Sequence, residues 1–205
     1  MSNPWEKIKL DDYENHMSLD SVYQLQVLNE IMREQFEAYD VESIMILGVA
    51  GGNGLEHIAE DKIKKVYGVD VNQSFLAECV KRYGSLGKLF EPICADLLAD
   101  DLQLPQSDLL VANLLVEYIG YDCFQKVVGV VAPEYVSCII QINTGSSFVS
   151  DSPYLHAFDC LEEVHHQMEE DALVDSMSEI GYRKVVQSEQ ELPNGKKFVK
   201  VDFSR

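Results

Sequence analysis

Short apolar runs and segments of helical spacing alternate along most of this chain. The runs have the length of strands, and in the segments between them apolar residues recur every three or four positions. This alternation is typical of a parallel sheet with helices on both faces. The predicted strands are residues 44–48, 65–70, 89–94, 108–113 and 135–142, and the predicted helices are 54–60, 74–83 and 121–131, with a short turn near 97–102.

The C-terminal part departs from this alternation. Residues 154–180 have helical spacing and end before a glycine, a residue type common just after a helix. Residues 182–188 and 197–203 are strand-like, and Asn194-Gly195 between them is a strong signal for a tight hairpin turn. The sequence therefore predicts a doubly wound α/β fold, with a seven-stranded, mostly parallel sheet that ends in an antiparallel hairpin.

An N-terminal helical segment, residues 1–40, precedes the sheet, and residues 41–205 form the expected Rossmann-like core of a single domain. Residues 19–39 are predicted to be one helix because their apolar side chains fall on a single stripe. Residues 1–18 are more polar, and in the simplest interpretation they are a loose leader to a helix that docks on the edge of the sheet.

A glycine-rich stretch follows the first predicted strand, with four glycines between positions 48 and 54. Such a stretch costs too much backbone entropy for a helix or strand interior and suits a sharp turn close to a ligand. A helix that starts at this turn would point its free N–H groups at that ligand. The second strand ends in Asp70, 22 residues after Gly48, which is about the glycine-to-acid spacing of a nucleotide-binding βαβ unit. An acid there can accept both hydroxyls of a ribose, so we expect a nucleoside-containing cofactor.

The order of the glycines distinguishes between cofactors. A dinucleotide fingerprint requires G-x-G-x-x-G, but in the register that starts from Gly52 and Gly54 the sixth position is His57. The stretch instead resembles the first motif of class I S-adenosylmethionine-dependent methyltransferases, roughly E/D-x-G-x-G-x-G. Ala50 stands at the first glycine place, and Gly48 replaces the usual acid. The resemblance covers about residues 40–205, and it implies S-adenosylmethionine as cofactor, S-adenosylhomocysteine as product, and a last strand between the fifth and sixth.

The resemblance also implies a set of cofactor-binding residues. Asp70 matches the ribose-binding acid, Asp96 matches the acid near the adenine, and Asn113 with Leu114 matches the motif beside the methyl donor. The residues expected at the cofactor are Gly48, Ala50, Gly51, Gly52, Asn53, Gly54, Asp70, Val71, Asp96, Leu97, Asn113, Leu114, Tyr13 and Met17.

The N-terminal segment has a second interpretation under this resemblance. In similar methyltransferases this segment folds over the cofactor pocket as a lid, and Tyr13, His16 and Met17 would then face the pocket. An aromatic ring and a thioether suit a sulfonium and its methyl group. The loose leader and the lid both remain open at this point.

The loop after the fourth strand is the expected place for substrate contacts. Enzymes that methylate exocyclic amines of nucleobases carry D/N/S-P-P-aromatic there, whereas two leucines replace both prolines in this chain. Glu117 resembles the first glutamate of protein arginine methyltransferases, but Lys126 stands near the place of the second. Glu117, Tyr118 and His16 are candidate catalytic residues, and Glu117 is a candidate for holding or deprotonating a substrate.

The net charge of −19 favours a small-molecule substrate, because such a protein repels nucleic acid and anionic membranes. The start of the chain lacks a secretory signal and no apolar run has membrane length. Five cysteines without a C-x-x-C pair are typical of reduced residues in a cytoplasmic protein, which we expect to be a monomer or homodimer. His165-His166 and the nearby glutamates are more typical of an exposed helix than of a metal site, so no metal is expected.

Three functions are compatible with these features. The first is methyl transfer from S-adenosylmethionine to a small molecule. The second is another nucleoside-cofactor enzyme, such as an aminopropyltransferase or an NAD-dependent dehydrogenase. The third is a module that keeps the cofactor cleft but acts by binding a partner, for which Gly48 in the acidic place is the main argument.

Overall fold

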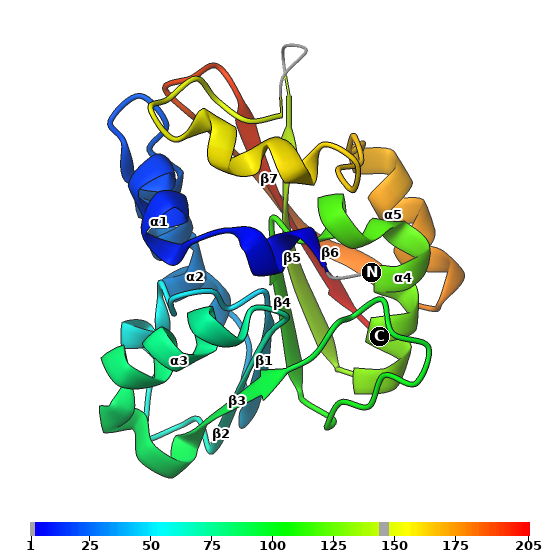
Figure 1. The fold of residues 1–205 in the computed structure, drawn as a ribbon. Helices are drawn as coiled ribbons and strands as arrows, with labels where there is room; N and C mark the ends of the chain where they lie inside the picture. The colour runs from blue at the N-terminus through cyan, green and yellow to red at the C-terminus, as the bar shows by residue number, and fades with distance from the viewer. Residues whose placement is uncertain (1–2, 144–147) are drawn as a thin grey trace.

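Helices cover both faces of a seven-stranded sheet in the computed structural model, which describes residues 3–143 and 148–205 (Figure 1). The strands are β1 (Ser43–Leu47), β2 (Lys65–Asp70), β3 (Phe90–Cys94), β4 (Leu109–Asn113), β5 (Tyr135–Ile142), β6 (Arg183–Glu191) and β7 (Lys197–Ser204). Their order is β3-β2-β1-β4-β5-β7-β6, in which β1 to β5 pair in parallel and β7 pairs antiparallel with both β5 and β6. The prediction of a mostly parallel sheet with a C-terminal hairpin is confirmed.

The helices lie in two layers. The α-helices are α1 (Leu10–Ser18), α2 (Gln24–Glu37), α3 (Gln73–Arg82), α4 (Val116–Val131) and α5 (Glu170–Glu179). Shorter 3-10 turns are η1 (Pro4–Lys7), η2 (Leu55–His57), η3 (Gly84–Leu89) and η4 (Leu155–Leu161). In the described part of the chain, no helix is long and apolar enough to span a membrane.

Side chains of the central strands alternate between two apolar clusters, one on each face of the sheet. Met45 and Leu47 of β1 pack into the cluster that includes α4 and α5, whereas Ile44 and Ile46 pack into the cluster that includes α2 and α3. Because both faces are covered, the strand reads as a continuous apolar run rather than as an alternating one.

The hairpin between β6 and β7 has the predicted turn. Glu191 pairs with Lys197 across it, and Gly195 has a φ of 78°, which favours glycine. Strand β7 is almost fully buried between β5 and β6, while β6 is exposed along its whole length as the edge strand.

The N-terminal helices differ from the prediction. The polar leader contains a regular helix, α1, on which Leu10, Tyr13 and Met17 share one face. The predicted helix 19–39 is wrong at its start, because α2 begins only at Gln24. The backbone reverses direction between α1 and α2, and Tyr23 there has a left-handed φ of 54° that ends any continuous helix.

Three further helices differ from the prediction in extent. The predicted helix 54–60 is only the single turn η2, because Ile58 is already extended, so the glycine-rich turn is not followed by a long helix. Helix α4 starts at Val116, but Gly120 inside it has non-helical angles (φ 72°, ψ 167°), so the predicted helix 121–131 is the part of α4 after this kink. The predicted helical segment 154–180 is interrupted between η4 and α5, where the backbone N–H of His166 donates 2.7 Å to the carbonyl oxygen of Glu117.

Candidate functional site

A cavity of about 100 Å³ lies at the carboxyl ends of the parallel strands, the edge where ligands bind in open α/β sheets. Every strand from β1 to β4 contributes to it through the residues at its end or just after it. Of the residues expected at the cofactor, those that line this cavity are Gly48, Ala50, Asp70, Val71, Asp96, Leu97, Asn113, Leu114 and Tyr13. The structure thus brings together segments that are far apart in sequence.

Asp70 is the more buried of the two carboxylates in the cavity, with 9% of its surface exposed. Its Oδ2 accepts the backbone N–H of Ala50 at 2.9 Å, and its Oδ1 accepts the N–H of Asn72 at 2.8 Å. Burial raises the pKa of Asp70 above its usual range, and these hydrogen bonds oppose that shift. Each carboxylate oxygen keeps a further lone pair, so the group can still accept two hydroxyls of a ligand.

The glycines of the turn after β1 have two different roles. Gly48 has a φ of +69°, so a side chain there would be strained, which accounts for glycine in the place of the usual acid. Gly52 and Gly54 face protein rather than the cavity. A Cβ on Gly52 would lie 2.7 Å from the ring of Tyr83, and one on Gly54 would lie 2.9 Å from Met32. These two glycines therefore allow close packing of α2 and α3 against the turn.

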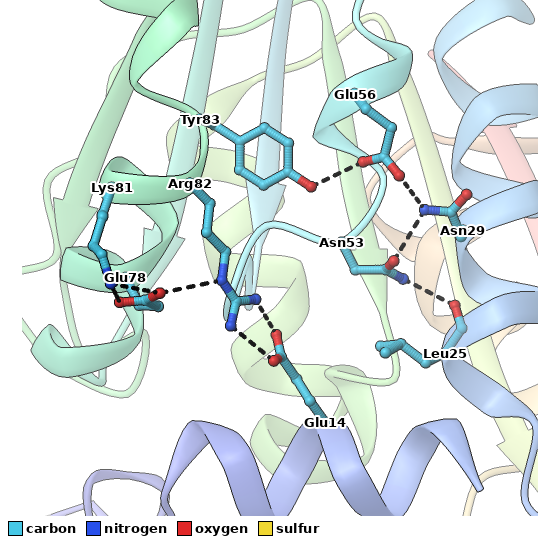
Figure 2. Close-up of polar contacts among 9 residues, drawn as sticks. All are labelled: Glu14, Leu25, Asn29, Asn53, Glu56, Glu78, Lys81, Arg82 and Tyr83. Carbon is cyan, nitrogen blue, oxygen red and sulfur yellow. Dashed lines mark hydrogen bonds and ion pairs between the residues drawn. The ribbon is translucent and has the colours of Figure 1, made fainter.

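Gly51 and Asn53 line a smaller cavity of about 40 Å³ beside the first, together with Gly48 and Ala50. Figure 2 shows the hydrogen bonds that fix this side of the turn. The amide of Asn53 donates to the carbonyl of Leu25 at 3.0 Å, and the amide of Asn29 donates to Asn53 at 3.0 Å. Helix α2 is thereby attached to the glycine-rich turn through side-chain hydrogen bonds.

The N-terminal segment passes from α1 across the central strands in Figure 1, and η1 lies over the first cavity. The side-chain amide of Asn72 donates to the carbonyl oxygens of Trp5 at 2.9 Å and Ile8 at 3.2 Å. The ring of Trp5 meets the ring of Tyr118 edge-on, with 4.9 Å between centroids. The N-terminal segment therefore covers the first cavity in this structure. That it opens and closes as a lid stays a prediction. Residues 1–2 of the predicted lid lie outside the described residues.

Asn113 lines the first cavity, but its amide group is held from behind by Gln35 of α2. The two amides exchange hydrogen bonds of 2.9 and 3.0 Å, and Gln35 also donates to the hydroxyl of Ser137 at 2.8 Å. Gln35 is fully buried, so this network fixes the end of β4 beside the cavity.

A second cavity of about 60 Å³ adjoins the first. Trp5, Tyr13, Leu114 and Tyr118 line both cavities and form the boundary between them. The other residues around the second cavity are His16, Met17, Gln24, Glu117, Gln141, Phe148, Val149, Ser150, Phe158 and His165. All three candidate catalytic residues, from α1 and from the start of α4, therefore meet at this second cavity.

Glu117 is buried in the first turn of α4, with 3% of its surface exposed. Its Oε1 accepts the backbone N–H of Gln141 at 2.7 Å, whereas its Oε2 has no hydrogen-bond partner among the described residues. Burial raises the pKa of Glu117 to about 7. A carboxyl group with a pKa near 7 and one unpartnered oxygen can bind a hydrogen-bond donor or exchange a proton.

The histidines beside this cavity are neutral at physiological pH. Burial, followed by the positive charge of Lys196, lowers the pKa of His16 to about 4. Burial also lowers the pKa of His165 to about 4, and its ring stacks on Phe148 with 4.1 Å between centroids. Nδ1 of His16 lies 2.7 Å from the hydroxyl of Ser152, so His16 is anchored to the segment before η4.

Several residues around the second cavity were not predicted from sequence: Trp5, Gln24, Gln141, Phe148, Phe158 and His165. The single tryptophan of the chain, close to a proline in an otherwise polar leader, is a signal that could have indicated an N-terminal contact but not its position. His165 and His166 do not act as a pair, because His165 faces the cavity while the His166 side chain is exposed. Within residues 3–143 and 148–205, no three His, Cys, Asp or Glu side chains form a metal-binding group.

No protein-family model and no curated protein matches this sequence. Solved structures do match its fold. A S-adenosylmethionine-dependent methyltransferase from Leishmania major is 13% identical, with a TM-score of 0.71 over 98% of this chain and 80% of that protein. The N-methyltransferase NodS from Bradyrhizobium japonicum WM9, in complex with S-adenosylhomocysteine, is 13% identical, with a TM-score of 0.67 over 94% of this chain and 95% of NodS. The [4+2]-cyclase SpnF is 10% identical, with a TM-score of 0.65 over 87% of this chain and 80% of SpnF. This chain therefore has the fold of the class I methyltransferases.

Proposed function

We propose that this protein transfers the methyl group of S-adenosylmethionine to a small molecule and releases S-adenosylhomocysteine. The observation that carries the proposal is the position of Asp70, whose carboxylate lies at the end of β2 and lines the first cavity beside the glycine-rich turn. Similar folds support it, since NodS is an N-methyltransferase that was solved with S-adenosylhomocysteine bound.

The residues around the first cavity fit this cofactor. Asp70 would hold the ribose hydroxyls, since both of its oxygens keep a lone pair after binding the N–H groups of Ala50 and Asn72. Asp96 and Leu97 would flank the adenine, and Gly48 with Asn113 would lie near the amino-acid end. The bound cofactor supplies an activated methyl group, so the protein mainly has to orient an acceptor in line with it.

The acidic surface supports a small-molecule substrate over a nucleic acid, because a net charge of −19 repels phosphates. The fold alone does not define the reaction, since the [4+2]-cyclase SpnF shares it. Aminopropyl transfer, hydride transfer with NAD, and partner binding without turnover are the alternatives that an experiment has to separate.

Calorimetry with S-adenosylmethionine, S-adenosylhomocysteine and NAD tests the cofactor. We expect both sulfur compounds to bind and NAD not to bind. Asp70→Ala removes charge-assisted hydrogen bonds to the ribose, so S-adenosylhomocysteine should bind at least about tenfold more weakly to this variant. Asp101→Ala changes an exposed acid outside the cavity and is the matched control. Unchanged affinity in a folded Asp70→Ala variant would contradict the cofactor assignment.

Turnover then separates an enzyme from a binding module. The full chain is incubated with methyl-labelled S-adenosylmethionine and a panel of metabolites, and labelled products are detected by mass spectrometry. Labelled product that depends on Asp70 supports methyl transfer. Cofactor binding without labelled product from any acceptor class favours the non-methylating alternatives.

A further inference from the structure

Glu117 lines the second cavity and carries a buried carboxylate oxygen without a hydrogen-bond partner among the described residues. Glu117 is 3% exposed, and its Oε2 has no hydrogen bond within the part of the chain that the structure describes. An unpartnered buried carboxylate oxygen is costly unless a ligand or water supplies a donor. A cavity of about 60 Å³ beside Glu117 has room for either, since one water needs roughly 10–15 Å³.

The amides of Gln24 and Gln141 and the ammonium of Lys196 donate their hydrogen bonds to other acceptors. The side-chain amide of Gln24 donates to the side-chain oxygen of Gln141, and the amide of Gln141 donates to Asn143 at 2.7 Å and to the carbonyl of Phe148 at 3.0 Å. The ammonium of Lys196 donates to the same carbonyl. Both N–H groups of Gln141 are thereby used, and no described side chain donates a hydrogen bond to Oε2 of Glu117, so a ligand in the cavity can supply that donor.

Five aromatic residues line the cavity. Trp5, Tyr13 and Tyr118 form the side shared with the first cavity. Phe148 and Phe158 lie on the remaining wall. The edge-on contact of Trp5 with Tyr118 puts two π systems beside the acidic group. Aromatic faces attract cations, and an aromatic box closed by one carboxylate is a site for a protonated amine.

From these observations we infer that the second cavity is the methyl-acceptor site and that it takes a primary or secondary amine, with its N–H group on Oε2 of Glu117. This inference rests on the proposed function, and it narrows the substrate to one chemical class. A carboxylate would be repelled by Glu117, and an alcohol would gain the hydrogen bond but not the attraction between opposite charges. The net charge of −19 also attracts cationic ligands to the protein.

The chemistry balances with these groups. The amine binds as an ammonium ion and gives up one proton, so that its nitrogen lone pair can form a bond to the methyl carbon. The carbon–sulfur bond of the donor breaks and its electron pair stays on sulfur, which becomes neutral. The Glu117 carboxylate can accept the released proton, because burial raises its pKa to about 7, and can pass it to solvent after product release. No oxidant or metal is required.

The test uses the full chain saturated with S-adenosylhomocysteine. Butylamine, piperidine and benzylamine are each paired with the alcohol and the carboxylate of the most similar carbon skeleton, and binding is measured by calorimetry and ligand-observed NMR. We expect at least one amine to bind more tightly than both of its partners. Glu117→Gln should weaken that amine by roughly ten- to a hundredfold, because the carboxamide keeps the bond from Gln141 but presents no charge.

Glu163→Gln, an exposed glutamate outside the cavity, is the matched control and should change nothing. Trp5→Leu is a second variant that leaves the sheet untouched, and loss of its ring should weaken amine binding about two- to thirtyfold. The inference is overturned if no amine binds, if alcohols or carboxylates bind as well as amines, or if Glu117→Gln binds amines like the wild type. Failure of S-adenosylhomocysteine to bind any variant would instead contradict the proposed function, so the two failures are distinguishable.

Discussion

The carboxylate of Glu14 in α1 forms an ion pair with the guanidinium of Arg82 at the end of α3, with 2.9 Å between Oε2 and Nη2 (Figure 2). Both side chains lie directly above the glycine-rich turn, where a Cβ on Gly51 would come within 2.7 Å of Arg82. The pair therefore attaches α1 to α3, and so holds the N-terminal segment over the first cavity.

The first prediction follows from this ion pair. Arg82→Ala should increase cleavage before Leu19 in limited proteolysis several-fold, because α1 loses a bidentate contact. The free energy of unfolding should change by less than about 1 kcal/mol, since both side chains are partly exposed. S-adenosylhomocysteine should protect the segment in the wild type, as expected for a lid.

Lys81→Ala is the control for this experiment. Lys81 forms an ion pair of 3.1 Å with Glu78 on the same helix, as Figure 2 shows, so its removal leaves the ion pair between Glu14 and Arg82 in place. Equal cleavage of both variants, together with full cofactor affinity in a chain that lacks residues 1–18, would reject the lid and favour a permanently docked segment.

The sheet was predictable because its signals are local. Strand β1 is a continuous apolar run, and Asn194-Gly195 has few conformations other than a tight turn. Residues around the first cavity were predictable for the same reason, since Gly48 and Asp70 stand at strand ends and their order is fixed by the βαβ unit.

The second cavity depends on tertiary contacts that the local sequence does not encode. Nothing near Trp5 indicates that η1 folds back over the strands, because the bonds that hold it come from Asn72, far along the chain. A glutamate at the start of a helix is ordinarily solvated, so the burial of Glu117 follows only from the positions of Gln141 and His165 around it. Helix α1 was not predicted as a separate helix, because its nine residues make too few turns to show a clear helical period of apolar side chains. Its apolar face contacts the cavities.

The second prediction concerns Gly52. Gly52→Ala should destabilise the protein by about 2 kcal/mol or more, because φ is +90° there and the new Cβ would lie 2.7 Å from the ring of Tyr83 and 2.8 Å from the sulfur of Cys79. Gly84→Ala is the matched control, since its Cβ would meet nothing within 4 Å. Chemical denaturation measures both; a Gly52→Ala variant as stable as Gly84→Ala would contradict the packing role of this glycine.

The third prediction concerns the buried amide behind Asn113. Gln35→Leu removes both hydrogen bonds of the Asn113 amide, and a buried polar group without a partner costs about 1–3 kcal/mol. We expect a loss of stability of that size and weaker S-adenosylhomocysteine binding, because the end of β4 is no longer fixed. Glu34→Leu, an exposed neighbour on α2, should change stability by less than about 0.5 kcal/mol. Similar stability of the two variants would show that the amide pair contributes little.

The last prediction concerns pH and Glu117. Burial raises the pKa of Glu117 from 4.5 to about 7, so between these values the folded protein keeps a proton that the unfolded chain has released. The contribution of Glu117 to stability is therefore largest below pH 4.5 and falls as the pH rises to 7, by at most about 3 kcal/mol, since one pKa unit corresponds to about 1.4 kcal/mol.

The groups around Glu117 titrate in the opposite sense, which dictates how this prediction is tested. The pKa of His16 and of His165 is lowered to about 4, so these histidines destabilise the folded state as the pH falls below 6.5. Burial also lowers the pKa of Lys196, to about 8, so Lys196 likewise favours the folded state at higher pH. Urea unfolding of the wild type and of Glu117→Gln between pH 4 and 8 isolates the carboxyl group, because the other groups are common to both chains. The variant should gain stability relative to the wild type as the pH rises from 4.5 to 7. If the difference in unfolding free energy between the wild type and Glu117→Gln does not change with pH over this range, Glu117 has an ordinary pKa. A carboxylate with an ordinary pKa would be too weak a base to accept a proton from an ammonium ion at neutral pH.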